Sequence, residues 1–412
     1  MHHYLIKWCW KETNLALTDY KVAFDNSYQE IFQKTLVAKD IANMRLEPML
    51  TYGGSVTRVA MDISGVQVRS VTRGSASVID SITDTAEALT INLEKEAAFY
   101  LSDGEVTQTG PLKAMQFAGK EIARKLATDL DGRVFGEIVN ASFSFDNGDL
   151  TTGSSSGTAI TLSLTTVPQL TTRLGAKLRR KNNQEVMTNM ALVVDSYAAS
   201  DISQFIISKN IDIAGATFKN GYVGDVASAQ MYISENLPST ATLVSTGTFS
   251  DGDTVTVHGV VFTMKTTLGA TAGNVLIGAN AAASITNLTA LINAPTVTTA
   301  QGVAITSVSD LEILSHVTAV ATSATVMTIN TVGLGRLDLS ETAANFSWAT
   351  NTLLAYYGKK GAIDLVVQDM KEVDVRPTAD RRGNNIFSSY LAGIKTFADG
   401  AKKFLQVKIL VA

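Results

Sequence analysis

Apolar residues at helical spacing form one stripe that runs for roughly thirty residues after Gly110 and Pro111. The stripe consists of Leu112, Met115, Ile122, Leu126, Leu130, Val134 and Ile138. At a rise of 1.5 Å per residue it predicts a helix about 45 Å long, and Pro111 suits the first turn. Gly119, Gly132 and Gly136 interrupt the stripe, and each costs up to about 1 kcal/mol relative to alanine. Close packing or a bend must compensate, so tertiary contacts hold this helix.

The segments before this helix change their pattern twice. Residues 1–52 predict an arm with an amphipathic helix, because Tyr20, Phe24 and Tyr28 recur at helical spacing. From Gly53 to about Asp103 apolar and polar residues alternate instead, which predicts a long extended hairpin with a polar tip. An amphipathic helix and an extended hairpin both need a surface to cover.

The segments after the helix mix strand and helix signals. The loop 146–157 is rich in Gly, Ser and Thr and predicts an exposed turn. Helices are predicted at 168–180 and 198–207, and strands at 191–194 and near 231–233. The fold class is therefore α+β or α/β.

Residues 240–350 differ in composition from the rest of the chain. Thr, Ala, Val and Ser dominate, and only two basic residues oppose six acidic ones, so this segment carries the whole net charge of -4. It predicts a hairpin at 254–265, a helix at 281–293, and strands near 303–308 and 324–329. Because residues 351–412 have the same mixed composition as the residues before 240, we interpret 240–350 as a β-rich domain inserted into a host fold.

The composition also limits the function. With a net charge of -4 over 412 residues, the chain has no long-range attraction for phosphate backbones or anionic lipid. The single cysteine, Cys9, cannot form an internal disulfide. No apolar run reaches the length of a membrane span, and the N-terminal apolar patch is too short and too charged for a signal peptide. We expect a protein that folds in the cytoplasm where it is made.

Four stretches, in this order, resemble the major capsid proteins of tailed bacteriophages. They are TDYKVAFDNSYQEIFQKTLVAKDIAN with YGGSVTR, then LTINLEKEAAFYLSDGEV, then ALVVDSYAASDI with GYVGDVASAQMYISENLP, and finally AIDLVVQDM with YLAGIKTFADGAKKFLQVKILVA. The likeness covers about residues 15–240 and 351–412. The stretches GDTVTVHGVVFTMK and IGANAAASITNLTALIN resemble a module that recurs in phage virion proteins.

The resemblance implies an α+β phage major capsid fold with an inserted β-rich domain. Its parts would be an N-terminal arm (1–52), an extended loop (53–106), a spine helix with the peripheral and first axial parts (107–239), the insertion (240–350) and the remaining axial and peripheral part (351–412). The implied function is self-assembly into an icosahedral shell around the genome. Another virion component, such as a tail-tube or adhesion protein, is the alternative.

The implied partners are copies of the chain in pentamers and hexamers, with scaffolding, portal or decoration proteins as further candidates. The shell would be a virion component assembled in the host cytoplasm, and it would enclose double-stranded DNA without sequence-specific binding and without a membrane. Some relatives join subunits through a lysine of the extended loop. No lysine lies between Asp40 and Glu94, so we predict noncovalent shells.

The residues expected at contacts between subunits are aromatic and basic. Arginines on the hairpin and in the polar stretch after 370 could contact DNA, but acidic neighbours such as Asp374 and Asp380 favour ion pairs between subunits. The predicted set is Tyr20, Phe24, Tyr28, Arg58, Arg69, Arg73, Arg376, Arg381 and Arg382.

The sequence offers no pattern typical of an enzyme, and we predict none. Its four histidines are too scattered for a zinc or haem site, and nucleotide-loop, nucleophile-elbow and zinc-protease motifs are missing. Asp251 and Asp253 could suit calcium, but a polar turn is favoured. A hydrolase with unrecognised cleft residues remains a second alternative. We predict no catalytic residue, cofactor or metal.

Overall fold

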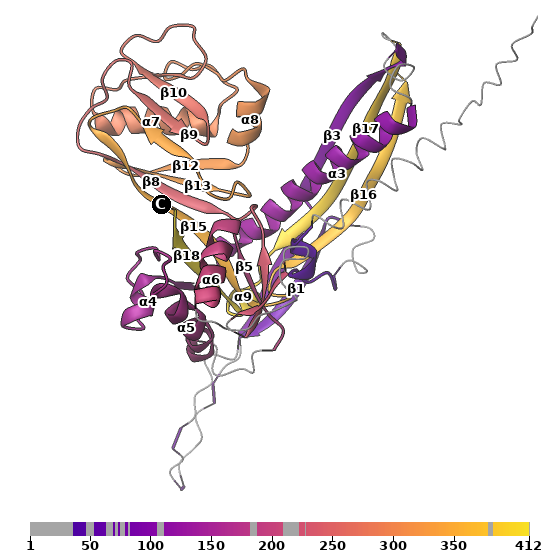
Figure 1. The fold of residues 1–412 in the computed structure, drawn as a ribbon, viewed down its shortest axis with the longest axis vertical. Coiled ribbons are helices and arrows are strands. Elements are labelled where there is room, and N and C mark those ends of the chain that lie inside the picture. The colour runs from indigo at the N-terminus through magenta and orange to yellow at the C-terminus, as the bar shows by residue number, and fades with distance from the viewer. Residues whose placement is uncertain are drawn as a thin grey trace, which may run out of the picture. The chain divides into compact units, whose positions relative to one another are not determined.

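The computed structural model describes residues 36–46, 53–62, 69–70, 73–74, 79–80, 83–104, 111–181, 188–208, 222–226, 228–377 and 382–411. The chain forms two compact units. In described residues the first unit contains 93–104, 111–127, 369–377 and 382–391, and the second contains the remainder. Helices and strands are mixed in both, which confirms the α+β class (Figure 1). The predicted helix at Tyr20 to Tyr28 lies outside the described residues.

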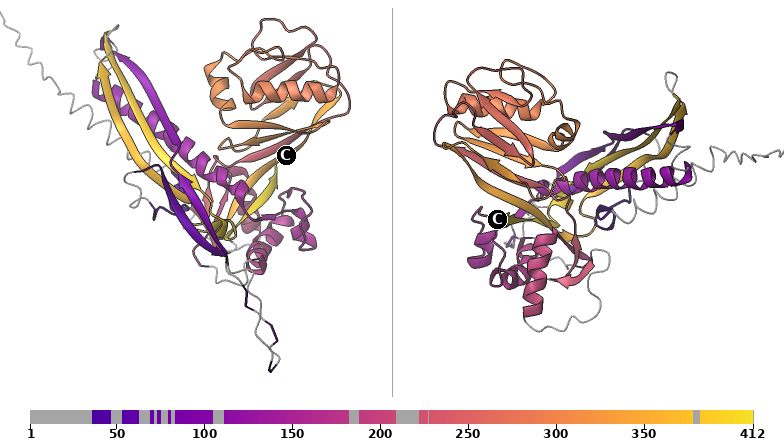
Figure 2. Two further views of the ribbon diagram at one scale, coloured as in Figure 1. Left: turned by 180° about the vertical axis from the view of Figure 1, so that it is seen from behind. Right: turned by 45° about the horizontal axis from the view of Figure 1, so that its top comes forward.

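The first unit is built on a three-stranded sheet with the order β16-β17-β3. Its strands are β3 (Leu93–Ser102), β16 (Asp364–Pro377) and β17 (Gly383–Lys395). Exposure alternates along the first half of β3, as expected for a sheet with one covered face. The first part of α3 (Pro111–Gly136) runs along this sheet in both figures (Figures 1 and 2).

The second unit has a nine-stranded sheet at its centre. Seven strands follow the order β12-β13-β8-β15-β5-β7-β6, and β18 pairs with β15 and β4. Their bounds are β4 (Phe143–Phe145), β5 (Met190–Val194), β6 (Tyr222–Val226), β7 (Ala229–Ile233), β8 (Ser239–Ser245), β12 (Val317–Ser323), β13 (Val326–Thr331), β15 (Phe346–Lys359) and β18 (Phe404–Leu410). Every residue of β5 is buried, which explains its unbroken apolar run.

Outside α3 and the segment 240–350, four described α-helices belong to the same unit. The predicted helices are confirmed as α5 (Thr166–Lys181) and α6 (Ser196–Ser208). The buried side chains of α5 recur every three or four residues, at Val167, Leu170, Leu174 and Leu178. The loop 146–157 is not only a turn, because it contains α4 (Asn147–Thr151). Asp146 caps this helix in a capping box that sequence spacing alone did not reveal. The fourth helix is α9 (Ala398–Ala401).

The predicted hairpin is present but shorter than expected. Strands β1 (Ser55–Asp62) and β2 (Thr83–Thr90) pair antiparallel in a two-stranded sheet, from Ser55 opposite Thr90 to Asp62 opposite Thr83. Extension of the hairpin to Asp103 is wrong, because Leu93 begins β3 in another sheet. The alternating pattern continues through both strands, so it does not show where the partner changes.

The segment 240–350 forms a four-stranded sheet and extends the nine-stranded one. The small sheet has the order β11-β10-β9-β14, from β9 (Thr254–Val257), β10 (Val260–Lys265), β11 (Asn274–Leu276) and β14 (Leu339–Glu341). The helix α7 (Ala281–Asn293) is as predicted. His258 and Gly259 have positive φ (49° and 88°), which matches a two-residue hairpin turn. The independence of this segment as a domain stays a prediction.

One predicted strand in this segment is wrong. Residues 303–308 form no strand, and the helix α8 (Val308–Leu314) begins at their end. The Ser307 side chain accepts a hydrogen bond from the Asp310 backbone N–H, so a helix cap decides the local structure. The strand predicted at 324–329 is confirmed as β13, two residues later.

The glycines in the second half of α3 allow a close approach, as predicted. A Cβ on Gly132 would lie 2.7 Å from the Cα of Gly333, and one on Gly136 would lie 2.9 Å from a Val332 methyl. Gly333 itself has φ of 77°. Side chains at these positions would push the loop after β13 away from the helix.

Candidate intersubunit surfaces and a basic cavity

Arg58 on β1 already has partners within the chain. It forms an ion pair of 2.7 Å with Asp399 and lies 5.3 Å above the Phe397 ring. Burial raises the pKa of Asp399, but the hydrogen bond and charge of Lys403, with those of Arg58, outweigh it and hold this pKa below its ordinary value. Arg58 therefore attaches the base of the hairpin to α9.

The other hairpin arginines lie in the segment between β1 and β2. Arg69 forms an ion pair with Asp80, and Arg73 is exposed in a turn beside Gly74, whose φ is 93°. Ile79 is 91% exposed. An apolar side chain so open to water, in a ribbon with charged neighbours, is what a contact segment would present.

The arginines of the first unit are held by short contacts to their own unit. Arg376 pairs with Asp374 at 2.6 Å and lies 5.0 Å above the Phe387 ring. The carbonyl of Arg382 accepts hydrogen bonds from the Tyr100 hydroxyl and the Asp103 N–H. Arg381 lies outside the described residues, as do Tyr20, Phe24 and Tyr28. No single cluster gathers the described members of the predicted set, and their contact with other subunits stays a prediction.

The hairpin strands expose one face of their ribbon, as far as its side chains are described. On β1, Ser55, Thr57, Arg58 and Val59 are all exposed, and Val59 reaches 59%. Only Leu89 of β2 is fully buried among the side chains described there, where it packs with Val366 and Phe397. The described part of the ribbon is thus anchored through one face and exposed on the other.

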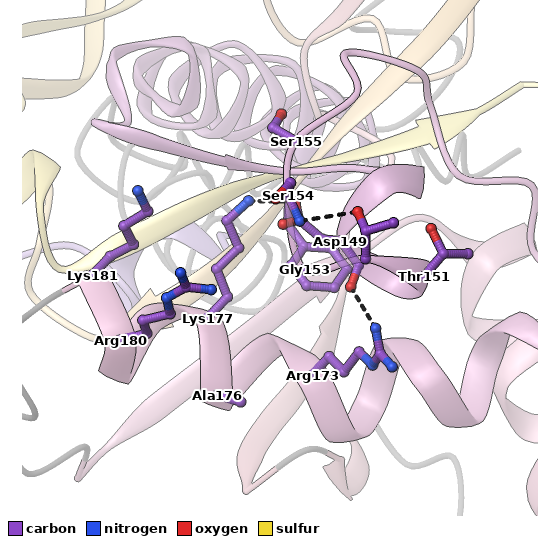
Figure 3. A pocket seen from close by; sticks show the side chains of 12 residues that line it. Asp149, Thr151, Gly153, Ser154, Ser155, Arg173, Ala176, Lys177, Arg180 and Lys181 are labelled. Carbon is purple, nitrogen blue, oxygen red and sulfur yellow. Dashed lines mark hydrogen bonds and ion pairs between the residues drawn. The ribbon is translucent and has the colours of Figure 1, made fainter.

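A cavity of about 530 Å³ lies between the 146–157 loop and α5 (Figure 3). Four cations and one carboxylate line it: Arg173, Lys177, Arg180, Lys181 and Asp149. All four cations come from one helix and recur at intervals of three, four or one residues, which places them on neighbouring positions of one face. That spacing is readable in the sequence, but the cluster was not among the predicted sites.

The loop side of the cavity is ordered around Asp146. Its carboxylate accepts hydrogen bonds from the backbone N–H groups of Gly148, Ser156 and Gly157 and from the Ser155 hydroxyl. Burial raises the pKa of Asp146, but these hydrogen bonds outweigh burial and lower it. A charged Asp146 therefore fixes the loop that faces α5.

Asp131 on α3 is a buried acid that fastens the segment 36–41. Its carboxylate accepts the backbone N–H of Val37 at 3.0 Å and that of Ala38 at 2.9 Å. Burial is the main cause that raises the pKa of Asp131 to about 7. The side chain is fully buried, so it serves the fold rather than a surface.

In the part of the chain that the structure describes, no three His, Cys, Asp or Glu side chains converge in a way that could hold a metal ion. Asp251 and Asp253 form the predicted polar turn. Asp251 accepts from the N–H of Thr266, and Asp253 accepts from that of Ser250. Among the described helices, none has the length and apolar character needed to cross a bilayer.

No family model and no curated protein matches the sequence. Similar solved structures include one titled Mycobacterium phage Che8, with 14% identity over 90% of this chain and 90% of that chain and a TM-score of 0.46. The capsid of cyanophage P-SCSP1u has 12% identity over 88% and 84%, with a TM-score of 0.43. A virus-like particle from Pyrococcus furiosus has 9% identity over 94% and 97%, with a TM-score of 0.40. The chain is thus similar to phage capsid proteins, the class that the order of its sequence segments resembles.

Proposed function

We propose that this chain is a major capsid protein that assembles into the icosahedral shell of a bacteriophage. The observation that carries the proposal is the ribbon β1–β2, which pairs with no third strand among the described residues and leaves one face of its described side chains exposed. A two-stranded hairpin alone is marginally stable in water. Such a ribbon is best explained as an element that neighbouring copies cover.

The anchoring of the ribbon supports this role. At its base the Gln368 side chain donates to the Gly53 carbonyl, and the Glu87 carboxylate accepts from the Ala398 N–H. The Lys395 ammonium donates to the Ala88 carbonyl. A fixed base with one exposed face presents the ribbon in one direction, which lowers the entropy that assembly must remove.

Open sheet edges offer a second route to association. In the described residues β3 and β16 are the outer strands of the first unit's sheet. Outer strands hold backbone N–H and C=O groups that another chain can pair with. Many such weak contacts add up in a closed shell, so no single strong interface is needed.

The remaining parts of the proposal follow from shell formation. The chain would act as a structural protein and not as an enzyme, in pentamers and hexamers of the virion assembled in the host cytoplasm. The shell would enclose double-stranded DNA, and scaffolding, portal or decoration proteins would be its other partners.

Electron microscopy of the purified full-length protein tests the proposal, with light scattering to measure particle mass. We expect closed shells of uniform diameter. Tubes or fibres would favour the tail-tube or adhesion alternative instead. A protein that stays monomeric across salt and crowding conditions would contradict both functions.

A further inference from the structure

We propose that the basic cavity between the 146–157 loop and α5 binds phosphate groups of a nucleic-acid backbone. The identification of the cavity as an anion site stands on its geometry. The choice of nucleic acid as the source of the phosphate rests on the proposed function, because a shell protein faces packed DNA.

The charge of the lining points to an anion. Lys177 pairs with Asp149, and Arg173 donates to the Asp149 backbone carbonyl, so one carboxylate faces four cations. Within the described part of the chain, neither Arg180 nor Lys181 forms an ion pair. Excess cations around one cavity repel each other, and a bound anion would relieve that repulsion.

Helix stabilisation does not explain the cluster fully. Cations near a helix C-terminus are favourable, and Arg179, Arg180 and Lys181 all lie in the last turn of α5. Lys177 and Arg173, however, lie one and two turns earlier, and Arg179 does not line the cavity. The four lining cations share a face that the helix dipole does not require.

The chemistry of the lining favours phosphate over a simple carboxylate. Arg173 and Arg180 offer planar forks of N–H donors, which suit oxyanions with several oxygens, and Lys177 and Lys181 add point charges. The loop side adds the hydroxyl of Ser154, which lines the cavity opposite the helix (Figure 3).

The size and spacing favour an extended ligand. A space of about 530 Å³ is in the range of small-molecule sites and far exceeds a single phosphate ion. Positions four residues apart on a helix lie about 6 Å from each other, so Arg173, Lys177 and Lys181 form a row. A row of cations along an open space can track successive phosphates of one strand.

The test compares matched variants of the full-length protein. Arg180→Gln with Lys181→Gln removes two lining charges, whereas Arg179→Gln with Lys402→Gln removes two exposed charges outside the cavity. Binding of a fluorescent DNA duplex is measured by anisotropy across a salt series. We expect the first pair to weaken binding about tenfold or more and to reduce the salt slope by about two, and the second pair to change neither markedly.

Competing ligands identify the source of the phosphate. Inorganic phosphate and an acidic peptide of glutamates are titrated by calorimetry against the same proteins. If the protein binds inorganic phosphate but not DNA, the nucleic-acid assignment is wrong. If it prefers the glutamate peptide, the assignment of the cavity as a phosphate site is wrong. Equal DNA binding by the two double variants would overturn the site.

Assembly is scored separately by electron microscopy. If the wild-type protein forms shells and the two double variants bind DNA equally well, the cavity proposal is wrong and the proposed function still stands. If no shells form, the proposed function fails, while the calorimetric arm still reports on the cavity.

Discussion

Asp131 is a buried acid whose pKa of about 7 lies well above the ordinary aspartate value of 3.8. The folded protein therefore holds this proton more tightly than the unfolded chain. Between about pH 4 and 7 stability falls as the pH rises, and above pH 7 this contribution is constant. A shift of this size corresponds to at most about 4 kcal/mol.

Asp131→Asn should remove this contribution. The amide keeps an oxygen for the Val37 or Ala38 N–H but has no charge to bury. In urea unfolding at pH 5, 6, 7 and 8, the stability of the variant relative to wild type should increase up to about pH 7 and then level off. Asp201→Asn on α6 controls for the loss of a carboxylate elsewhere. A constant difference between the Asp131 variant and wild type would contradict the prediction.

Helices and turns could mostly be predicted from the sequence, because the patterns that specify them are local. The helix predicted at 168–180 and the hairpin predicted at 254–265 are both present, as α5 and as β9 paired with β10. Strand partners were not predictable, because alternation fixes the faces of a strand but not its neighbour. For that reason the change of sheet between β2 and β3 could not be predicted from the sequence.

The cavity shows the same limit for a site. Its four cations lie on one helix and were visible in the sequence. Their opposing wall, however, depends on the pairing of Lys177 with Asp149, 28 residues earlier, and on the loop that Asp146 orders. The described arginines of the predicted contact set could be named, but not their intrachain partners, such as Asp399, which is 341 positions from Arg58.

The hairpin ribbon yields a prediction at the scale of an element. Val59→Asp places a charge on an exposed strand position and should change the free energy of unfolding by less than about 0.5 kcal/mol. It should nevertheless greatly reduce the yield of shells, because the charge would be buried against a neighbour. Sedimentation and electron microscopy measure that yield.

Val261→Asp is the matched control for the ribbon variant. Val261 is 49% exposed on β10, in the small sheet rather than on the ribbon. We expect its shell yield to match wild type. If Val59→Asp assembles as well as Val261→Asp, the ribbon is not a contact surface.

At the scale of the molecule, one buried apolar core is built from a single stretch of sequence. The buried apolar cluster of the 240–350 segment runs from Ala241 to Phe346, with Trp348 packed against it. Its outermost members belong to β8 and β15, which pair with each other and, for β8, with β13. The folding unit therefore includes both of these strands.

Two fragments test this boundary. Residues 239–353 keep β8 and the paired part of β15 and should give dispersed amide resonances. Residues 246–345 lack both strands, leave β13 without its partner β8, and should be unfolded or aggregated. Equal spectra from the two fragments would show that the boundary strands are dispensable.

The pairing of Ser245 with Phe346 places the entry and exit of that segment on adjacent strands, about 5 Å apart. Geometrically, a short turn could replace the hundred residues between them. Foreign polypeptides whose two ends lie close together could be grafted at the same junction. The graft would also have to shelter the β8 edge that β13 now occupies, so display of cargo on this protein depends on supplying a substitute strand.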